Sequence, residues 1–395
     1  MTENLSASKW VYLDNNATTR MDARVVDAMI PLLRENFANP SSGHALGTAA
    51  TAVLREARGQ VQGLIGAEHE REIVFTSGGS ESNNAAILSA LETQTGRDEI
   101  ITSTVEHPAI LSVCAYLAQT GRARIHSIPV DRNGNLNIEA FRCALNERTA
   151  LVTMQWANNE TGVQFPIELL ARMARNAGAL FHSDAVQAAG KVAIDVASSG
   201  VDMLTLSAHK MHGPKGIGAL YVRNGVPFVP LIHGGRQERG RRAGTENTAS
   251  IAGFGVAAKL AALTMPHEML RIGGLRDRLE GEILRLVPGS ILVGDKDNRL
   301  PNTLNIAFES VEADSILLLL ERALVAASSG SACATGSMEP SHVLRAMKVP
   351  FSNLRGAVRF SFSRENTEQD VARVLEVLPQ IANELQLRES LEASI

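Results

Sequence analysis

The residues most capable of chemistry form a short polar stretch near the middle of the chain. Ser207-Ala208-His209-Lys210 follows the apolar residues 201–206 and precedes a segment rich in glycine and proline. An apolar run bounded in this way is typical of a strand buried in a sheet, and in open parallel sheets ligands bind at the strand ends. Lysine is costly to desolvate unless it is paired or used, and one use is a Schiff base with an aldehyde. A solvated loop lysine is the alternative for Lys210 taken alone.

A glycine-rich turn earlier in the chain has the form of an anion-binding site. The strand-like residues 72–77 run into Gly78-Gly79-Ser80, and a helix is predicted to open at Ala85. Glycines let backbone amides converge, and a helix N-terminus adds unpaired donors and a favourable dipole. The glycine spacing differs from that of the dinucleotide and nucleotide-triphosphate motifs. The stretch therefore predicts phosphate binding at Gly79 and Ser80, with a plain strand-to-helix turn as the alternative.

Polar residues also follow the predicted strands between these two motifs, and they include His107, Asn159, Asp184 and Gln187. Strands separated by helices form right-handed crossovers and a mainly parallel sheet, so these side chains should gather at one edge. A cofactor with a phosphate, an aromatic nitrogen and an aldehyde would use the glycine turn, an acid and the lysine, and pyridoxal 5′-phosphate fits all of these requirements. Asp184 has a structural alternative as a helix N-cap, and His107 as a turn residue before Pro108.

The second reactive group is Cys333, which lies within ten small residues, 328–337. A thiol in such a loop is accessible, and its thiolate is a strong nucleophile. Cys114 and Cys143 lie in apolar helical surroundings and are predicted to be buried. Three widely spaced cysteines argue against a disulfide framework or a four-thiolate metal site. A lysine for an aldehyde cofactor and a reactive thiol in one chain imply chemistry at sulfur.

The elements that must position these residues change character along the 395-residue chain. Strands and helices alternate up to about Met265, and from there helices at 270–286, 314–323 and 369–387 interleave with short strands at 303–308 and 356–362. This change predicts a larger α/β domain followed by a smaller α+β domain.

Composition and charge narrow the class of protein. The net charge is −4, and the arginine-rich stretch at 236–242 suits contact with a phosphate or carboxylate better than with nucleic acid. We find no signal-peptide pattern and no apolar stretch that approaches the length of a transmembrane helix. The sequence therefore predicts a soluble cytoplasmic protein that binds neither nucleic acid nor membrane.

Taken together, these motifs resemble the cysteine desulfurases of the NifS/IscS type, in the class V aminotransferase branch of fold type I pyridoxal-phosphate enzymes. The arginine-rich stretch that ends Arg-Ala-Gly-Thr-Glu-Asn is most similar to the nitrogen-fixation (NifS) members. The resemblance implies a large domain, residues 20–262, with a mainly parallel seven-stranded sheet flanked by helices, and a small α+β domain, residues 1–19 and 263–395, that carries the cysteine loop. The matching stretches are residues 12–19, 39–42, 75–84, 106–107, 158–162, 184–187, 207–210, 236–247, 328–333 and 359–361.

The resemblance also implies the cofactor pyridoxal 5′-phosphate and the residues around it. Lys210 would form the Schiff base, Asp184 would keep the ring nitrogen protonated, and His107 would stack on the ring and assist proton transfer. Asn159 and Gln187 would lie near the phenolic oxygen. The residues implied to hold the phosphate are Gly79, Ser80, Ser207, His209 and Thr245, the last from the other subunit of a homodimer. Ser80 stands where the family more usually has threonine, and the hydroxyl is kept.

For the substrate, L-cysteine, the resemblance implies that Arg359 clamps the carboxylate and that Asn159 lies nearby. Cys333 would attack the substrate sulfur, which gives alanine and a persulfide. An iron–sulfur scaffold or another sulfur acceptor would collect that sulfur for cluster assembly, including nitrogenase clusters. No resident metal is expected, and the one candidate for a transient iron–sulfur ligand is Cys333.

Two alternatives remain open at this point. A selenocysteine lyase or another class V enzyme would share the cofactor, and Cys333 argues against a transaminase. A sulfur carrier or scaffold without catalysis would have no physical need of Lys210, Asp184 and His107.

Overall fold

The computed structural model describes residues 10–329 and 340–392. The predicted nucleophile Cys333 therefore lies outside the described residues.

The larger part of the fold is built on a seven-stranded sheet within the described residues, in the order β2-β8-β7-β6-β5-β3-β4. The strand β8 runs antiparallel to both of its neighbours, and the other adjacent pairs are parallel. The mainly parallel sheet predicted from the sequence is thus confirmed. The strands are β2 (Ile73–Thr76), β3 (Glu99–Ser103), β4 (Arg124–Ile128), β5 (Thr149–Gln155), β6 (Leu180–Asp184), β7 (Met203–Ser207) and β8 (Gly218–Val222).

Both faces of this sheet are covered by helices, because successive side chains of a strand point to opposite faces. In β7, Leu204 and Leu206 pack in the cluster that includes apolar residues of the helices α2 (Ala45–Ile65), α6 (Ile167–Asn176) and α8 (Thr248–Leu286). Met203 packs instead with residues of α3 (Gly79–Thr93) and α4 (Pro108–Gln119). The helices of this part are α1 (Ala23–Arg34), α2 (Ala45–Ile65), α3 (Gly79–Thr93), α4 (Pro108–Gln119), α5 (Ile138–Ala144), α6 (Ile167–Asn176) and α7 (Val196–Ser199), with the 3-10 turns η2 (Glu70–Glu72), η3 (Ala208–Lys210) and η4 (Gln237–Gly240).

The C-terminal part has its own apolar core, to which Leu13 of the N-terminal segment also belongs. A three-stranded antiparallel sheet within the described residues has the order β12-β10-β9, and the short strand β1 pairs in parallel with β11. The N-terminal segment is thus built into this part of the fold. The elements are β1 (Val11–Tyr12), β9 (Ile291–Leu292), β10 (Thr303–Ala307), β11 (Val325–Ala326), β12 (Ala357–Ser361), α9 (Ala313–Arg322), α10 (His342–Ala346), α11 (Phe351–Leu354) and α12 (Glu368–Glu392).

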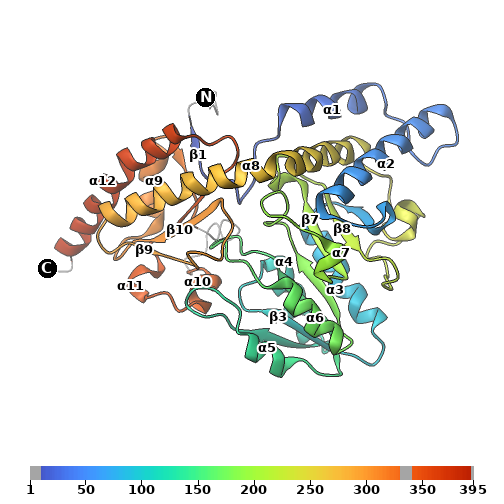
Figure 1. Cartoon of the computed structure of the whole chain (residues 1–395), viewed down its shortest axis with the longest axis horizontal. Helices are drawn as coiled ribbons and strands as arrows, with labels where there is room; N and C mark the ends of the chain where they lie inside the picture. The colour runs from blue at the N-terminus through green and yellow to red at the C-terminus, as the bar shows by residue number, and fades with distance from the viewer. Residues whose placement is uncertain (1–9, 330–339, 393–395) are drawn as a thin grey trace.

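The helix α8 (Thr248–Leu286) joins the two parts and runs without interruption across the predicted boundary between residues 262 and 263. Figure 1 shows it extending from the side of α1 and α2 to the side of α12. By length and composition its apolar stretch could cross a membrane, which corrects the expectation that no stretch approaches that length. Half of that stretch is buried in the structure, and Phe254, Ala257 and Ala258 belong to the main core, as in the core helix of a globular protein.

Two further expectations are corrected. The helix after the glycine turn begins at Gly79 rather than at Ala85, so Gly79 and Ser80 form its first turn. Cys143, predicted to be buried, is exposed on α5, whereas Cys114 is buried on α4 as predicted. The short helix α5 buries little beyond Phe141, so the apolar letters around Cys143 do not indicate a core position.

Candidate active site

A cavity of about 540 Å³ lies at the carboxyl ends of the parallel strands, where it also meets the C-terminal part of the chain. Its volume is in the range usual for small-molecule sites. Ten of the residues predicted from the sequence line it: Gly79, Ser80, His107, Asn159, Asp184, Gln187, Ser207, His209, Lys210 and Arg359.

Two predicted residues are not among those that line this cavity. Thr245 is exposed and lies in the segment between η4 and α8. Cys333 belongs to the residues that are not described, so its prediction stays a prediction.

Lys210 ends the short turn η3, which follows directly on β7. Its Nζ donates to the backbone oxygens of Asn16 and Ala17, each at 2.6 Å. Both acceptors belong to the polar turn after β1. A lysine that lines a cavity and donates to backbone carbonyls is well placed to react with a carbonyl ligand.

Asp184 is the last residue of β6 and is buried. Its Oδ2 accepts from Asn83 Nδ2 at 2.7 Å, and its Oδ1 accepts from the backbone N–H of Val186 at 3.0 Å. The second contact resembles an N-cap, but no helix begins at Val186. The two donors fix the carboxylate at the wall of the cavity, where it can pair with a protonated ring nitrogen.

The first turn of α3 brings the glycine-rich stretch to the cavity, where a helix N-terminus favours an anion. A Cβ atom at Gly79 would lie 3.0 Å from Val186 Cγ2, so a glycine keeps this wall open. Next to it, Ser207 ends β7, with its Cβ 3.8 Å from where a Cβ at Gly79 would lie. His209 Nδ1 lies 3.1 Å from Thr18 Oγ1. Burial, reinforced by Lys210 and other nearby lysines, lowers the pKa of His209 to about 4. His209 is therefore a neutral partner at this end of the cavity.

His107 is the N-cap of α4, and its Nδ1 accepts from the backbone N–H of Ala109 at 3.1 Å. Because Nδ1 accepts, the neutral ring carries its proton on Nε2. Burial lowers the pKa of His107, with Lys210 and His342 acting in the same direction and Asp184 opposing them. The ring is thus neutral near pH 7 and can hold or release a proton at Nε2.

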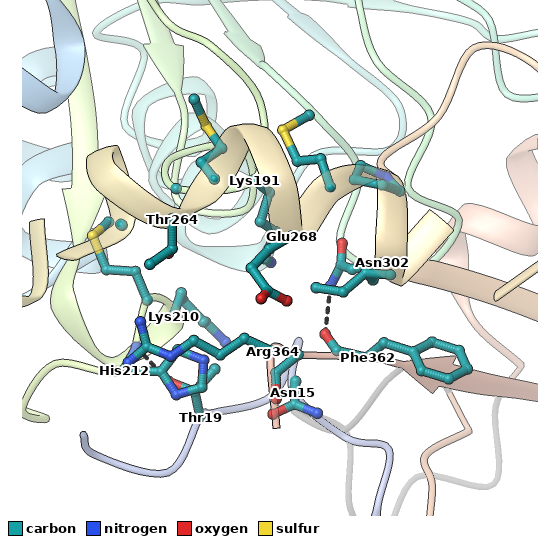
Figure 2. Close-up of a pocket in the computed structure, with 18 residues that line it drawn as sticks. Asn15, Thr19, Lys191, Lys210, His212, Thr264, Glu268, Asn302, Phe362 and Arg364 are labelled. Carbon is teal, nitrogen blue, oxygen red and sulfur yellow. Dashed lines mark hydrogen bonds between the residues drawn. The ribbon is translucent and has the colours of Figure 1, made fainter. Parts of the chain in front are cut away.

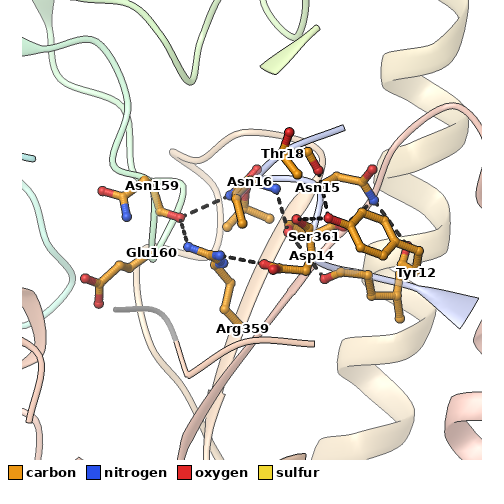
Figure 3. A network of polar contacts seen from close by, with 12 residues as sticks. Tyr12, Asp14, Asn15, Asn16, Thr18, Asn159, Glu160, Arg359 and Ser361 are labelled. Atoms are coloured by element: carbon orange, nitrogen blue, oxygen red, sulfur yellow. Dashed lines mark hydrogen bonds and ion pairs between the residues drawn. The ribbon is translucent and has the colours of Figure 1, made fainter. Parts of the chain in front are cut away.

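Arg359 lies within β12 on the opposite wall of the cavity and is 1% exposed. Its Nη1 donates to the backbone oxygen of Asn159 at 3.0 Å, and its Nη2 donates to Asp14 Oδ1 at 2.8 Å. Figure 3 shows this guanidinium between Asn159 and Asp14, beside the turn that contains Asn16. A planar guanidinium in this position can bind a carboxylate.

Several residues of the site were missed by the sequence reasoning. The backbone oxygen of Asn16 accepts from Lys210 Nζ, and Asn16 Nδ2 donates to the backbone oxygen of Asn159. Asn16 therefore joins the two walls of the cavity. Asn83, which holds Asp184, stands four residues after Gly79 on α3, and this helical spacing was the signal that could have found it. His342 Nε2 lies 2.9 Å from the backbone oxygen of Glu106 and carried no motif.

The residues present fit pyridoxal 5′-phosphate by their chemistry. Within the described part of the chain, Asn83 Oδ1 and Gln155 Nε2 are buried and have no hydrogen-bond partner, although both residues line the cavity. Buried polar atoms of this kind are normally satisfied, here by a polar ligand or water. Among the described residues, no group of three or more His, Cys, Asp and Glu side chains is placed to hold a metal ion.

Comparison with known proteins gives a consistent result along nearly the whole chain. Residues 11–374 match the family described as aminotransferase class-V. A cysteine desulfurase of Gluconacetobacter diazotrophicus is 59% identical over 95% of this chain and 94% of its own length, and the cysteine desulfurase NifS of Azotobacter vinelandii is 55% identical over 95% and 93%.

Solved structures agree with these relatives. A NifS-like protein superposes with a TM-score of 0.89 at 36% identity over 95% of this chain and 100% of its own. A second NifS-like protein, from Rickettsia africae, gives 0.85 at 32% identity over 95% and 99%. The chain therefore belongs to the cysteine desulfurases of the class V aminotransferase family, which are pyridoxal-phosphate-dependent enzymes.

Proposed function

We propose that the cavity binds pyridoxal 5′-phosphate and that the protein converts L-cysteine to L-alanine, with transfer of the sulfur to Cys333. The observation that carries this proposal is the convergence, in one cavity, of Lys210, the fixed carboxylate of Asp184 and the N-terminal turn of α3, opposite the guanidinium of Arg359.

The cofactor's parts match separate walls of the cavity. Lys210 would hold the aldehyde carbon, Asp184 the ring nitrogen, and His107 one face of the ring. Asn159 and Gln187 would lie near the phenolic oxygen. The phosphate would be held by Gly79, Ser80, Ser207, His209 and the partner subunit's Thr245.

When bound, the cofactor supplies a carbonyl carbon for the substrate amino group and a ring that takes up electrons. The chain's own residues bind and orient the amino acid around it. Arg359, held by Asp14 and the backbone of Asn159, binds the substrate carboxylate. Lys210 Nζ and His107 Nε2 move protons at the reacting carbon.

Cys333 completes the sulfur transfer. Its thiolate attacks the substrate sulfur, so that a sulfur–sulfur bond forms as the carbon–sulfur bond breaks, and the carbon takes up a proton. The products are alanine and a persulfide on Cys333, and no external oxidant is needed. A thiol of an acceptor protein then removes the outer sulfur by thiol exchange. We infer that the acceptor is an iron–sulfur scaffold in the cytoplasm, and the similarity to NifS proteins supports supply of nitrogenase clusters.

The test measures alanine and sulfide from L-cysteine and a reductant, together with the visible absorption of the loaded protein. We expect Cys333→Ala to keep the absorption and to lose sulfide release, whereas the exposed-thiol control Cys143→Ala behaves as wild type. Lys210→Ala should lose both absorption and turnover. Full turnover in Cys333→Ala would refute the sulfur-transfer step, and wild-type protein that takes up no pyridoxal phosphate would refute the whole proposal.

A further inference from the structure

A second lysine lies directly behind the cavity wall that carries Gln187. Lys191 Nζ donates to Gln187 Oε1 at 2.9 Å and to Asn16 Oδ1 at 3.2 Å. The same lysine lines a smaller cavity of about 60 Å³, which Lys210 also lines. Figure 2 shows both lysines in that cavity, together with Glu268 of α8. Lys191 therefore stands between the two cavities, and it contacts the active-site wall from the rear.

The contact with Lys191 decides which way the amide of Gln187 faces. Lys191 Nζ is the donor in this contact, so the atom of Gln187 that meets it is the amide oxygen. The NH₂ end of the amide consequently points the other way, and it donates to the backbone oxygen of Asn16 at 3.1 Å. That oxygen is also the acceptor of Lys210 at 2.6 Å. Since the NH₂ group has two hydrogens, one remains for an acceptor in the large cavity that Gln187 lines.

The surroundings of Lys191 are unusual for a lysine that has only a structural role. Both of its acceptors in the described part of the chain are amide oxygens, and neither is a carboxylate. Burial lowers its pKa well below the usual value, and the nearby cations of Lys210 and Arg359 act in the same direction. The remaining charged or titratable groups that face it are His209 and, around the smaller cavity, Glu268, Arg364 and His212.

Placing an amine in such surroundings is costly, and an apolar side chain of the same length would avoid the cost. Among the described residues, the amine's hydrogen-bond acceptors are the two side chains of the active-site wall, Asn16 and Gln187.

We propose that Lys191 is a positioning residue that fixes the amide of Gln187, so that its NH₂ group faces the oxygen atoms of the ligand in the large cavity. The inference rests on the proposed function for the identity of that ligand, pyridoxal 5′-phosphate. A donor at its phenolic oxygen stabilises the anionic form of that oxygen.

The test compares holoenzymes of wild type and Lys191→Met by the pH midpoint of the visible absorption band. We expect the midpoint of Lys191→Met to rise by about one pH unit, the size expected for a lost hydrogen bond to a charged group. Lys191→Arg keeps a donor, and the adjoining cavity of about 60 Å³ leaves room for its larger head, so it should restore most of the wild-type midpoint. The exposed lysine control, Lys259→Met, should leave the midpoint unchanged.

A double-mutant cycle separates positioning from a direct effect of charge. If Lys191 acts through Gln187, then Gln187→Ala and the double variant Gln187→Ala/Lys191→Met share one midpoint. A further shift in the double variant, or an unshifted midpoint in Lys191→Met, overturns the proposal. Should Lys191→Met fail to fold, as judged by circular dichroism, Lys191→Leu, which also lacks a donor, takes its place under the same criteria. Wild-type protein that shows no visible band on loading would instead refute the proposed function.

Discussion

The buried carboxyl group of Glu106 should make the stability of the folded protein depend on pH. Glu106 is fully buried beside His107, and its Oε1 accepts from Ser103 Oγ at 2.6 Å. Its Oε2 has no hydrogen-bond partner among the described residues. Burial, with a smaller contribution from Asp184, raises the pKa of Glu106 from 4.5 to about 8. The folded protein therefore keeps this carboxyl protonated at neutral pH.

The sign of the effect follows from proton binding. Between pH 4.5 and about 8 the folded protein holds a proton on Glu106 that the unfolded chain has lost. The free energy of unfolding consequently falls as the pH rises through this window. The slope is about 1.4 kcal/mol for each pH unit, which gives about 2 kcal/mol between pH 6 and pH 7.5 and about 5 kcal/mol over the whole window.

The variant Glu106→Gln removes this slope, since an amide has nearly the shape of the protonated acid and does not titrate. Its oxygen can still accept from Ser103, and its NH₂ takes the place of the protonated oxygen. We expect urea unfolding, followed by circular dichroism from pH 5 to pH 9, to show the variant becoming more stable than wild type as the pH rises. The exposed-carboxylate control Glu147→Gln should follow wild type. Parallel curves for Glu106→Gln and wild type would refute the argument.

Three further substitutions test other features. Arg58→Met should cost about 3–5 kcal/mol in urea unfolding, because Arg58 holds the buried carboxylate of Glu238 with bonds of 2.7 and 2.8 Å. Gly162→Ala should cost about 1–3 kcal/mol, because Gly162 has a φ of +78° and its Cβ would lie 2.9 Å from Thr303 Cβ. Arg359→Lys should keep the visible absorption of the holoenzyme and raise KM for L-cysteine about 10-fold or more, because an ammonium cannot bind a carboxylate in bidentate fashion.

The first two of these substitutions have a matched control within the chain. Arg55→Met removes an exposed arginine from the same helix as Arg58 and should leave the urea midpoint nearly unchanged. Gly63→Ala adds a methyl group where nothing lies within 4 Å, so it should not destabilise. A KM that stays at the wild-type value in Arg359→Lys would contradict the carboxylate role, and midpoints equal to wild type in the first two variants would contradict the packing arguments.

The sheet and the residues at its strand ends were predictable because the signals for them are local. The strands β6 and β7 are short, largely buried runs, and a side chain that lines the cavity stands at or just beyond the end of each, Asp184 as the last residue of β6 and Lys210 three residues after β7. The right-handed crossover rule then places these ends together without any knowledge of tertiary contacts. The continuity of helix α8 was harder to predict from the sequence. Its exposed and buried stretches differ in composition, which suggested a break near Met265.

What the sequence could not show is how the two walls of the cavity are joined. Asp14 and Arg359 form an ion pair across 345 positions of the chain, and neither carries a local signal for the other. Asn16 accepts Lys210 through a backbone carbonyl, a group that every residue possesses and that no sequence pattern marks. Such contacts follow from the pairing of the N-terminal segment with the C-terminal part, through β1 with β11 and through the bridge between Asp14 and Ser361 of β12.

The short turn after β1 thus connects, through hydrogen bonds, the part of the site that carries Lys210 with the part that carries Arg359. The backbone oxygen of Asn16 accepts from Lys210 Nζ, and its side-chain Nδ2 donates to the backbone oxygen of Asn159. The backbone N–H of Asn16 donates to Ser361 Oγ, on the strand that carries Arg359. A displacement of the C-terminal part would therefore move the acceptor of Lys210 and the substrate-binding arginine together. Because these hydrogen bonds join buried or half-buried groups, the turn, together with the direct bond from Arg359 to the backbone oxygen of Asn159, holds the spacing between Lys210 and Arg359.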